Sequence, residues 1–338
     1  MIDLIEFHKS ALCLMETAPV VRATLFNKVG SSYLDVGAMA LFQNGVLKTG
    51  LISGGCLEND LANHSLSLNS ETPKKTVRYN ETTAEGIFDF STGCGGEIWV
   101  ALELLGTTDP LILFSQDPAW EKQKHWFVTF SETNSGHFEV SSVSQVPPTQ
   151  TQKPHSQPHK SFYLRYSHPP IINLVGAGPD SIALTKLLIE LNWKVNLIDF
   201  KTSLLEFFPI TSTKILAKVA FNKDSFHKTI ENHPDLLAAH HWICLTHNLD
   251  VDISVVKALS HHKHTKIGIL GSQNRASLFW NSLNDSVKNK LTQNGCEVII
   301  PLGQRTQNLG SNEIALSVAH HLLQKVFPYK PKSASPSA

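Results

Sequence analysis

The sequence lacks the features that would indicate a nucleic acid, a membrane or secretion. Its 29 basic and 29 acidic side chains leave no net charge, whereas sequence-independent nucleic-acid binding needs an excess of Lys and Arg to neutralise phosphates. No run approaches the roughly 18–20 apolar residues that cross a bilayer, and the acidic start lacks the basic residues of a secretory signal. We therefore expect a cytoplasmic protein without a nucleic-acid or membrane partner.

Cysteine is scarce, and the spacing of the cysteines matches no known paired motif. The chain has 5 Cys and no CxxC motif, which excludes a disulfide framework and a zinc ribbon. Cys13, Cys244 and Cys296 lie in apolar or helical segments, where we expect them to pack as small hydrophobic residues. Cys56 and Cys94 lie in glycine-rich turns, and we place the chemistry of the protein there.

Histidine, by contrast, is abundant and clustered. The chain has 17 His, with pairs such as His240-His241 and His320-His321. Metal binding is one interpretation of these clusters. The interpretation we favour is that the histidines replace Lys and Arg on wetted surface.

The length and a break in composition predict two domains. At about 100–200 residues per domain, 338 residues suffice for two cores, and 41% hydrophobic residues argue against a disordered chain. Residues 141–165 are rich in Pro, Ser and Gln and predict a linker. Residues 328–338 predict a disordered tail.

Residues 1–140 predict an α+β domain. Apolar residues recur at helical spacing over 3–15, and a strand is expected over 20–26. Asn44-Gly45 separates two apolar stretches and predicts a hairpin. Further strands are expected over 76–79 and 98–105, and also around 111–115, 126–130 and 137–142.

Residues 166–327 predict a Rossmann-like domain, so the fold class is α/β. Short apolar strands over 171–175, 194–199, 242–245, 267–270 and 298–300 alternate with helices over 180–191, 250–260, 274–290 and 312–326. Alternating strands and helices form a doubly wound parallel sheet covered on both faces.

The turn after the first of these strands predicts a nucleotide site. Gly176 and Gly178 precede a helix, and Asp199 ends the next strand, where an acid can accept from ribose hydroxyls. The alternative is a Rossmann scaffold that has lost or altered its ligand. A rival function follows from the same residues: an NAD(P)-dependent oxidoreductase in which His247, just after a strand, is the acid or base.

Three Gly/Ser loops mark the N-terminal domain. Ser53-Gly54-Gly55-Cys56 opens a helix, where free N–H groups can bind an anion and lower the pKa of a thiol. Glu58 follows in the first helical turn and suits the helix dipole. A second loop holds Cys94 among glycines, and a third contains Ser31. The alternatives are small core cysteines and, less well supported because no orienting acid is near, a nucleophilic cysteine.

These motifs, in order, resemble the XdhC/CoxI family of maturation factors for xanthine dehydrogenase and carbon monoxide dehydrogenase. The resemblance rests on the segments 30–38, 53–58, 93–96, 174–178, 246–250, 267–275 and 301–317, together with Asp199. It implies an accessory protein, not an enzyme, that binds molybdenum cofactor. Such a protein promotes sulfuration of the cofactor by a cysteine desulfurase and delivers it to an apo-enzyme of the xanthine dehydrogenase type. It also makes a homodimer a reasonable expectation.

The predicted site combines this resemblance with the residue chemistry. Cys56 and Cys94 are the expected ligands of the metal or its sulfido group, since soft thiolates suit a soft metal. The Rossmann domain would hold NAD(P), another nucleotide, or the nucleotide part of a dinucleotide cofactor. The cofactor-binding residues are predicted to be Ser31, Ser53, Gly54, Gly55, Cys56, Glu58, Gly93, Cys94, Gly95, Gly96, Gly176, Gly178, Asp199, Gly271 and Ser272.

Overall fold

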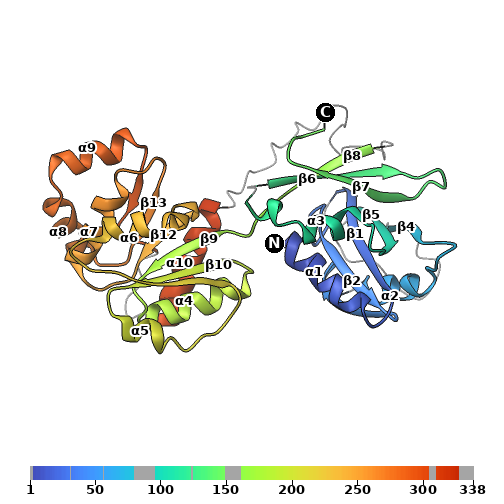
Figure 1. Cartoon of the computed structure of the whole chain (residues 1–338), viewed down its shortest axis with the longest axis horizontal. Helices are drawn as coiled ribbons and strands as arrows, with labels where there is room; N and C mark the ends of the chain where they lie inside the picture. The colour runs from blue at the N-terminus through green and yellow to red at the C-terminus, as the bar shows by residue number, and fades with distance from the viewer. Residues whose placement is uncertain are drawn as a thin grey trace. The chain divides into compact units, whose positions relative to one another are not determined.

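The computed structural model describes residues 3–30, 32–55, 57–79, 96–122, 125–148, 161–303 and 310–326. The chain divides into two compact units, Ile2–His168 and Pro169–Ala338 (Figure 1). Within the described residues no helix is long and apolar enough to cross a membrane.

The first unit is an α+β domain, as predicted. Its helices are α1 (Leu4–Met15), α2 (Glu58–Leu66), α3 (Pro110–Gln116) and the 3-10 helix η1 (Pro118–Lys122). Its strands are β1 (Val20–Val29), β2 (Met39–Gln43), β3 (Val46–Gly50), β4 (Lys74–Tyr79), β5 (Glu97–Leu104), β6 (His125–Glu132), β7 (Phe138–Ser144) and β8 (Ser161–Ser167). They form an antiparallel five-stranded sheet, β3-β2-β1-β5-β4, and a three-stranded sheet, β7-β6-β8.

The central strands of the five-stranded sheet are buried on both faces. Alternate residues of β1 enter two different cores, Val20 and Phe26 on one side and Val21, Ala23 and Leu25 on the other. The first core is completed by α1, α3 and the three-stranded sheet, and the second by α2. Cover on both faces explains why consecutive residues are buried along nearly all of β1 and all of β2.

Two details of the first unit differ from the sequence predictions. The segment around 111–115 is helix α3 and not a strand, because Asp109 caps its N-terminus by accepting from the N–H groups of Leu111 and Ile112, and Pro110 suits the first helical position. Two strands overlap the ends of the linker expected over 141–165, because β7 ends at Ser144 and β8 begins at Ser161. Residues 149–160 lie outside the described residues.

A buried charged cluster joins α1, β1 and the start of α3. Arg22, which is fully buried, donates to Glu103 at 2.8 Å and to both carboxylate oxygens of Asp109 at 3.0 Å. His8 lies 3.1 Å from the same guanidinium through Nε2 and 2.8 Å from the carbonyl oxygen of Leu4 through Nδ1. Because a guanidinium can only donate, Nε2 must accept and His8 must be neutral.

The second unit is a doubly wound α/β domain, as predicted. Its strands are β9 (Ile171–Val175), β10 (Lys194–Asp199), β11 (Ile215–Ala220), β12 (His241–Cys244), β13 (Lys266–Ile269) and β14 (Glu297–Ile299). Its helices are α4 (Pro179–Glu190), α5 (Thr202–Glu206), α6 (Phe226–Asn232), η2 (Pro234–Ala238), α7 (Leu249–Leu259), α8 (Gln273–Ser282), α9 (Asp285–Gln293) and α10 (Ser311–Val326).

All six strands of this sheet are parallel, in the order β11-β10-β9-β12-β13-β14. One face packs on α4 and α10, and the other packs on α6, α7, α8 and α9. The chain order reverses between β9 and β12, and in such sheets ligands bind outside the carboxyl ends of the strands at this point. The glycine turn and His247 both follow strands at this crevice.

Candidate functional site

The three glycine loops of the first unit leave the same end of its five-stranded sheet. In the register of the sheet, the last residue of β1, Val29, is paired with the first residue of β5, Glu97. Gly50, at the end of β3, is paired with Ala40 near the start of β2, and β4 ends beside β5. The strands that lead into the segments 30–38, 51–57 and 80–96, which are β1, β3 and β4, therefore all finish towards this same end of the sheet. We call it the glycine-loop end.

The Ser53-Gly54-Gly55 turn is organised by the carboxylate of Glu58. One oxygen of Glu58 accepts from the N–H of Ile52 at 2.9 Å and of Ser53 at 2.7 Å, and the other accepts from the Ser53 hydroxyl at 2.5 Å. Burial would raise the pKa of Glu58, but the hydrogen bonds from Ser53 and Ile52 outweigh it and lower the pKa. Glu58 is thus an ionised internal anion, beyond the helix-dipole role that its position suggests.

The hydroxyl of Ser53 accepts hydrogen bonds at the N-terminus of α2, where the N-cap side chain cannot. It accepts from the N–H of Leu57 at 3.0 Å and of Gly55 at 3.3 Å, while the N-cap residue itself, Leu57, makes no side-chain bond. The backbone donors that the sequence suggests for an external anion are therefore partly used within the protein.

What the turn presents outward is glycine backbone beside an aromatic ring. Gly54 and Gly55 are exposed, and a Cβ added to Gly55 would meet no atom within 4 Å. The Tyr33 ring, 70% exposed, lies 3.5 Å from the position of a Cβ on Gly54. Tyr33 belongs to the motif segment 30–38 but was not among the predicted site residues, although an aromatic residue in a Gly/Ser loop is a signal that could have found it.

Five of the predicted site residues are not among those that the structure describes. Ser31, Cys56, Gly93, Cys94 and Gly95 lie outside the described residues, and their roles stay predictions. Gly96 is described and directly precedes β5 at the glycine-loop end. Among the described residues no group of three His, Cys, Asp or Glu side chains is arranged to hold a metal ion.

The other three cysteines are described, and their environments differ. Cys244 is fully buried, and burial raises its pKa. Cys296 is half-buried, and its thiol lies 3.1 Å from the carbonyl oxygen of His262. Cys13 is exposed on α1, so the prediction that it packs inside was wrong.

In the second unit, Gly176 is required by a close approach of two loops. Its φ is +106°, and a Cβ there would lie 2.6 Å from the carbonyl oxygen of Leu245, the residue directly after β12. Gly178 is the N-cap of α4, and its Cβ position is open. The turn is thus held against β12 on one side and opens outward at Gly178.

Asp199 faces this turn. Its side chain is buried, with one oxygen accepting from the N–H of Ala177 at 2.6 Å and the other from the N–H of Lys201 at 2.7 Å. The carboxylate that the sequence suggests for ribose hydroxyls therefore braces the glycine turn from within. Whether it also contacts a nucleotide stays a prediction.

A second acid lies in the first turn of α4, where a phosphate would be expected. Asp180 is buried, and its carboxylate lies 3.0 Å from Nε2 of His247. The His247 side chain is 65% exposed and its backbone has φ +52°, an uncommon conformation for a residue with a Cβ.

A buried hydrogen-bond network lies at the same carboxyl end of the parallel strands. Asp252, fully buried on α7, accepts from the hydroxyl of Thr246 and from the guanidinium of Arg275, both at 2.6 Å. Burial raises the pKa of Asp252 despite these bonds. Ser272 caps α8 by accepting from the N–H of Arg275, and Gly271 gives room for the same side chain, since a Cβ there would lie 2.5 Å from its Cδ. Gly271 and Ser272 thus have structural roles beside the crevice.

Two family models match this chain. The XdhC Rossmann domain matches residues 172–322, and the XdhC and CoxI family matches residues 13–80. The matches cover more than half of the chain, one in each unit. The chain belongs to the XdhC and CoxI family.

Relatives of this XdhC and CoxI protein align over both units. It is 23% identical to a Bacillus subtilis protein named as a probable xanthine dehydrogenase subunit, over 94% of this chain and 97% of that protein. A crystal structure of a Bacillus halodurans protein, described as a xanthine dehydrogenase, superimposes with a TM-score of 0.74 at 23% identity, covering 99% of this chain and 98% of that one. At this identity the superposition establishes the fold.

The family matches include most of the features built above. The match over residues 13–80 contains the turn at Ser53 and the loop of Tyr33. The match over residues 172–322 contains the crevice of Gly176, His247 and Arg275. Residues 81–96, which carry Cys94, lie outside both matches.

Proposed function

We propose that this protein is an accessory factor of a xanthine dehydrogenase-type molybdenum hydroxylase, and that it binds molybdenum cofactor at the glycine-loop end. Membership of the XdhC and CoxI family and the name of the Bacillus subtilis relative support the association with xanthine dehydrogenase. The observation that supports the cofactor site is that the strands leading into three Gly/Ser segments, two of which carry a cysteine in the sequence, finish at one end of one sheet.

The residues at this end fit such a ligand. The bound cofactor supplies an anionic phosphate and a soft, thiolate-ligated metal. Exposed glycine backbone at Gly54 and Gly55 lets a large flat ligand approach closely, and the Tyr33 ring offers an apolar face. Cys56 and Cys94 would provide soft sulfur ligands. Glu58 fixes the conformation of this turn through its hydrogen bonds with Ile52 and Ser53.

In this proposal the protein has a carrier role instead of a catalytic one. It would shield the cofactor, present it to a cysteine desulfurase for sulfuration, and release it to the apo-hydroxylase. A homodimer is part of the proposal only as an expectation from the family.

The crevice of the second unit would hold the nucleotide part of a dinucleotide cofactor or a separate nucleotide such as NAD(P). Because Asp199 is turned into the glycine turn and Asp180 occupies the first turn of α4, we expect weaker binding than in a typical dinucleotide-binding enzyme. Titration with NAD, NADP and mononucleotides, followed by calorimetry, tests this. Substrate turnover with NAD(P)H would favour an oxidoreductase with His247 as its acid or base.

The decisive experiment compares three cysteine variants purified from a molybdenum-replete host. We expect Cys56→Ser and Cys94→Ser to lower molybdenum and pterin content per chain by about tenfold, since each removes a soft ligand. Cys13→Ser, an exposed cysteine on α1, is the matched control and should retain the wild-type content. Equal retention in all three variants would rule out the cysteine site.

A further inference from the structure

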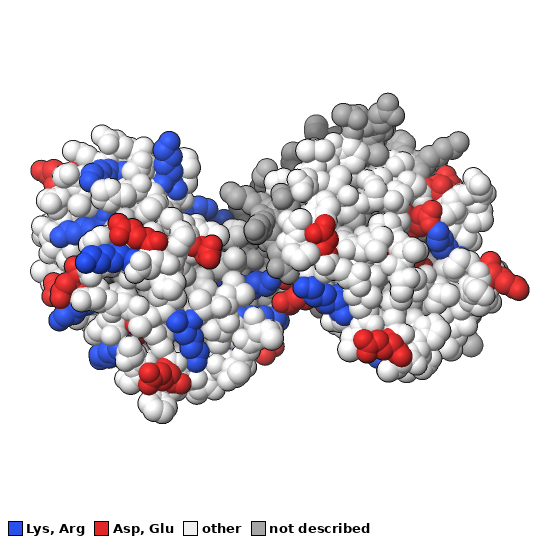
Figure 2. All heavy atoms as spheres, in the orientation of Figure 1, with Lys and Arg blue, Asp and Glu red and all other residues white. Residues whose placement is uncertain are grey.

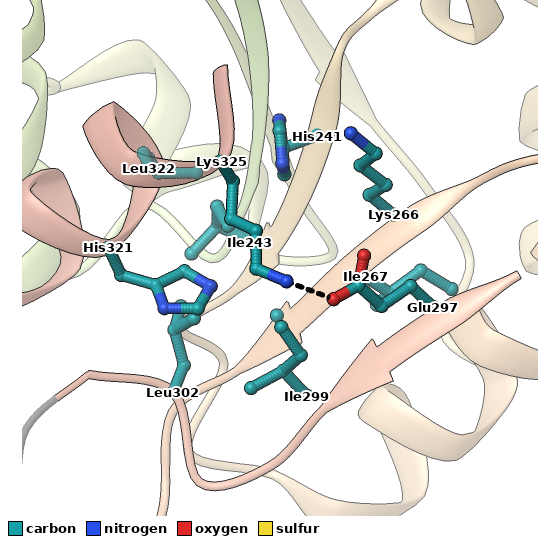
Figure 3. A pocket seen from close by; sticks show the side chains of 11 residues that line it. His241, Ile243, Lys266, Ile267, Glu297, Ile299, Leu302, His321, Leu322 and Lys325 are labelled. Carbon is teal, nitrogen blue, oxygen red and sulfur yellow. Dashed lines mark hydrogen bonds and ion pairs between the residues drawn. The ribbon is translucent and has the colours of Figure 1, made fainter. Parts of the chain in front are cut away.

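A second group of titratable side chains lies at the amino-terminal end of the parallel sheet, opposite the Gly176 turn. His241, Lys266 and Glu297 are the first residues of β12, β13 and β14. Helix α10 brings His321 and Lys325 over them (Figure 3). These residues line a cavity of about 10 Å³, close to the room that one water molecule needs.

His241 is the unusual member of this group. It is 6% exposed, and among the described residues neither of its ring nitrogens has a hydrogen-bond partner. A buried donor and acceptor left unpaired are destabilising, and an orphaned buried group calls for an explanation such as a bound water or ion. The interpretation of His241 as a wetted surface residue was therefore wrong.

The charges around the imidazole favour an anion. Lys266 and Lys325 contribute two positive charges, and Glu297 is the one carboxylate in the described lining. Lys325 binds Glu297 at 2.6 Å (Figure 3), and both side chains are about two-fifths exposed, so this ion pair is the part of the lining in contact with solvent.

The protonation state of His241 is consistent with this. Burial lowers its pKa to about 4, nearby Lys266, His240 and His321 add to this lowering, and Glu297 opposes them. A neutral imidazole keeps one N–H donor, and His241 lines the cavity together with Lys266 and Lys325.

We propose that this cavity is a binding site for a small oxyanion of the phosphate type. An oxyanion is larger than the closed cavity, so it enters as Lys325 separates from Glu297. One oxygen accepts from the N–H of His241, and the others pair with Lys266 and Lys325. Glu297 is then a competing internal anion, which turns towards solvent when the oxyanion binds.

The role given to Glu297 makes the proposal testable by the sign of one effect. We expect Glu297→Gln to tighten the binding of inorganic phosphate to the full-length protein, on the order of tenfold, because it removes the competing charge. Lys266→Gln and Lys325→Gln should each weaken it by a similar factor. Lys228→Gln on α6, which does not line the cavity, is the control and should bind as wild type. Calorimetry at pH 7 and constant chloride measures all five proteins.

A second measurement locates the phosphate. In nitrogen-15 NMR spectra of the histidine rings, phosphate should shift the His241 signals in the wild type and shift them less in Lys266→Gln. Weaker phosphate binding by Glu297→Gln, or His241 signals that stay unmoved at millimolar phosphate, would overturn the proposal; the second result would leave one water as the occupant. The test is independent of the proposed cofactor site, whose predicted ligands Cys56 and Cys94 belong to the other unit.

Discussion

At the residue scale, Glu58 binds the backbone donors that the sequence suggests for an external ligand. We expect Glu58→Gln to lower the free energy of unfolding by about 2–3 kcal/mol, since an amide cannot accept with both atoms and leaves a buried N–H or hydroxyl unpaired. Urea unfolding at pH 7 measures the loss. Glu71→Gln, at an exposed position, is the control, and an equal loss in both variants would contradict the role of Glu58.

The pH dependence of the same residue has a defined sign. The folded-state pKa of Glu58 lies below its ordinary value, so its contribution is fully present above that ordinary value and is lost as the pH falls towards the folded-state pKa. Below the ordinary carboxylate pKa, stability of Glu58→Gln should therefore fall less steeply than stability of the wild type.

His8 predicts a second loss of stability in acid, at higher pH. Burial, and then the charge of Arg22, lower its pKa from 6.5 to about 3, so between these values the unfolded chain binds a proton that the folded chain excludes. Stability is complete above the ordinary histidine pKa and falls as the pH drops, by about 2 kcal/mol at about pH 5. Titration of the His8 ring by NMR checks the cause. A midpoint at the ordinary histidine value would contradict it.

At the scale of elements, two glycines of the same turn, separated only by Ala177, should respond differently to the same substitution. Gly176→Ala places a Cβ 2.6 Å from a carbonyl oxygen at positive φ, which we expect to cost about 2–4 kcal/mol of stability. Gly178→Ala has open space and an ordinary φ of −79°, so its cost should stay below about 1 kcal/mol. Thermal unfolding of the two variants compares them, and similar costs would show that the β9–α4 turn is not fixed by β12.

Sequence patterns predict an element well when its signals are local. Helix α1 begins after Asp3, whose side chain accepts from the N–H groups of Ile5 and Glu6, and Asn44 and Gly45 adopt positive φ in the β2–β3 hairpin, as expected. Helix α3 was missed because its apolar residues are consecutive, so no alternation with polar residues reveals a helical period. The capping residue Asp109 is the only local signal that a helix begins there. The edge strand β11 was missed as well; only one of its six residues is buried, so it lacks the apolar run that marks a strand of a covered parallel sheet.

The candidate site, too, was predictable only where its signals are local in the sequence. Glycine spacing located the loops, because turns need particular backbone angles. It could not show that Glu58 and Asp199 point inwards, since the direction of a carboxylate depends on which N–H groups the tertiary fold leaves unpaired. His241 was misjudged for a related reason: a histidine pair at a strand start gives no sign of which member α10 covers.

At the scale of the whole molecule, charge is spread without a dominant sign. On the face shown in Figure 2, acidic and basic side chains of the described residues are interspersed, in keeping with a net charge of zero. Any anionic ligand must therefore be bound by local groups, such as the glycine backbone of the first unit or the lysines at the start of β13 and the end of α10.

The division into two units predicts that their functions can be separated. Every strand pairing among the described residues lies within one unit, and each unit has its own buried cores on both faces of a sheet. Residues 1–168 and 169–338, expressed separately, should each unfold cooperatively in urea. The first fragment, which carries Cys56 and Cys94, should retain molybdenum and pterin when purified from a molybdenum-replete host. The second should retain neither, but should still bind phosphate if the cavity at His241 acts as proposed. Cofactor retained by the second fragment alone would place the site in the Rossmann crevice and contradict the assignment to the glycine-loop end.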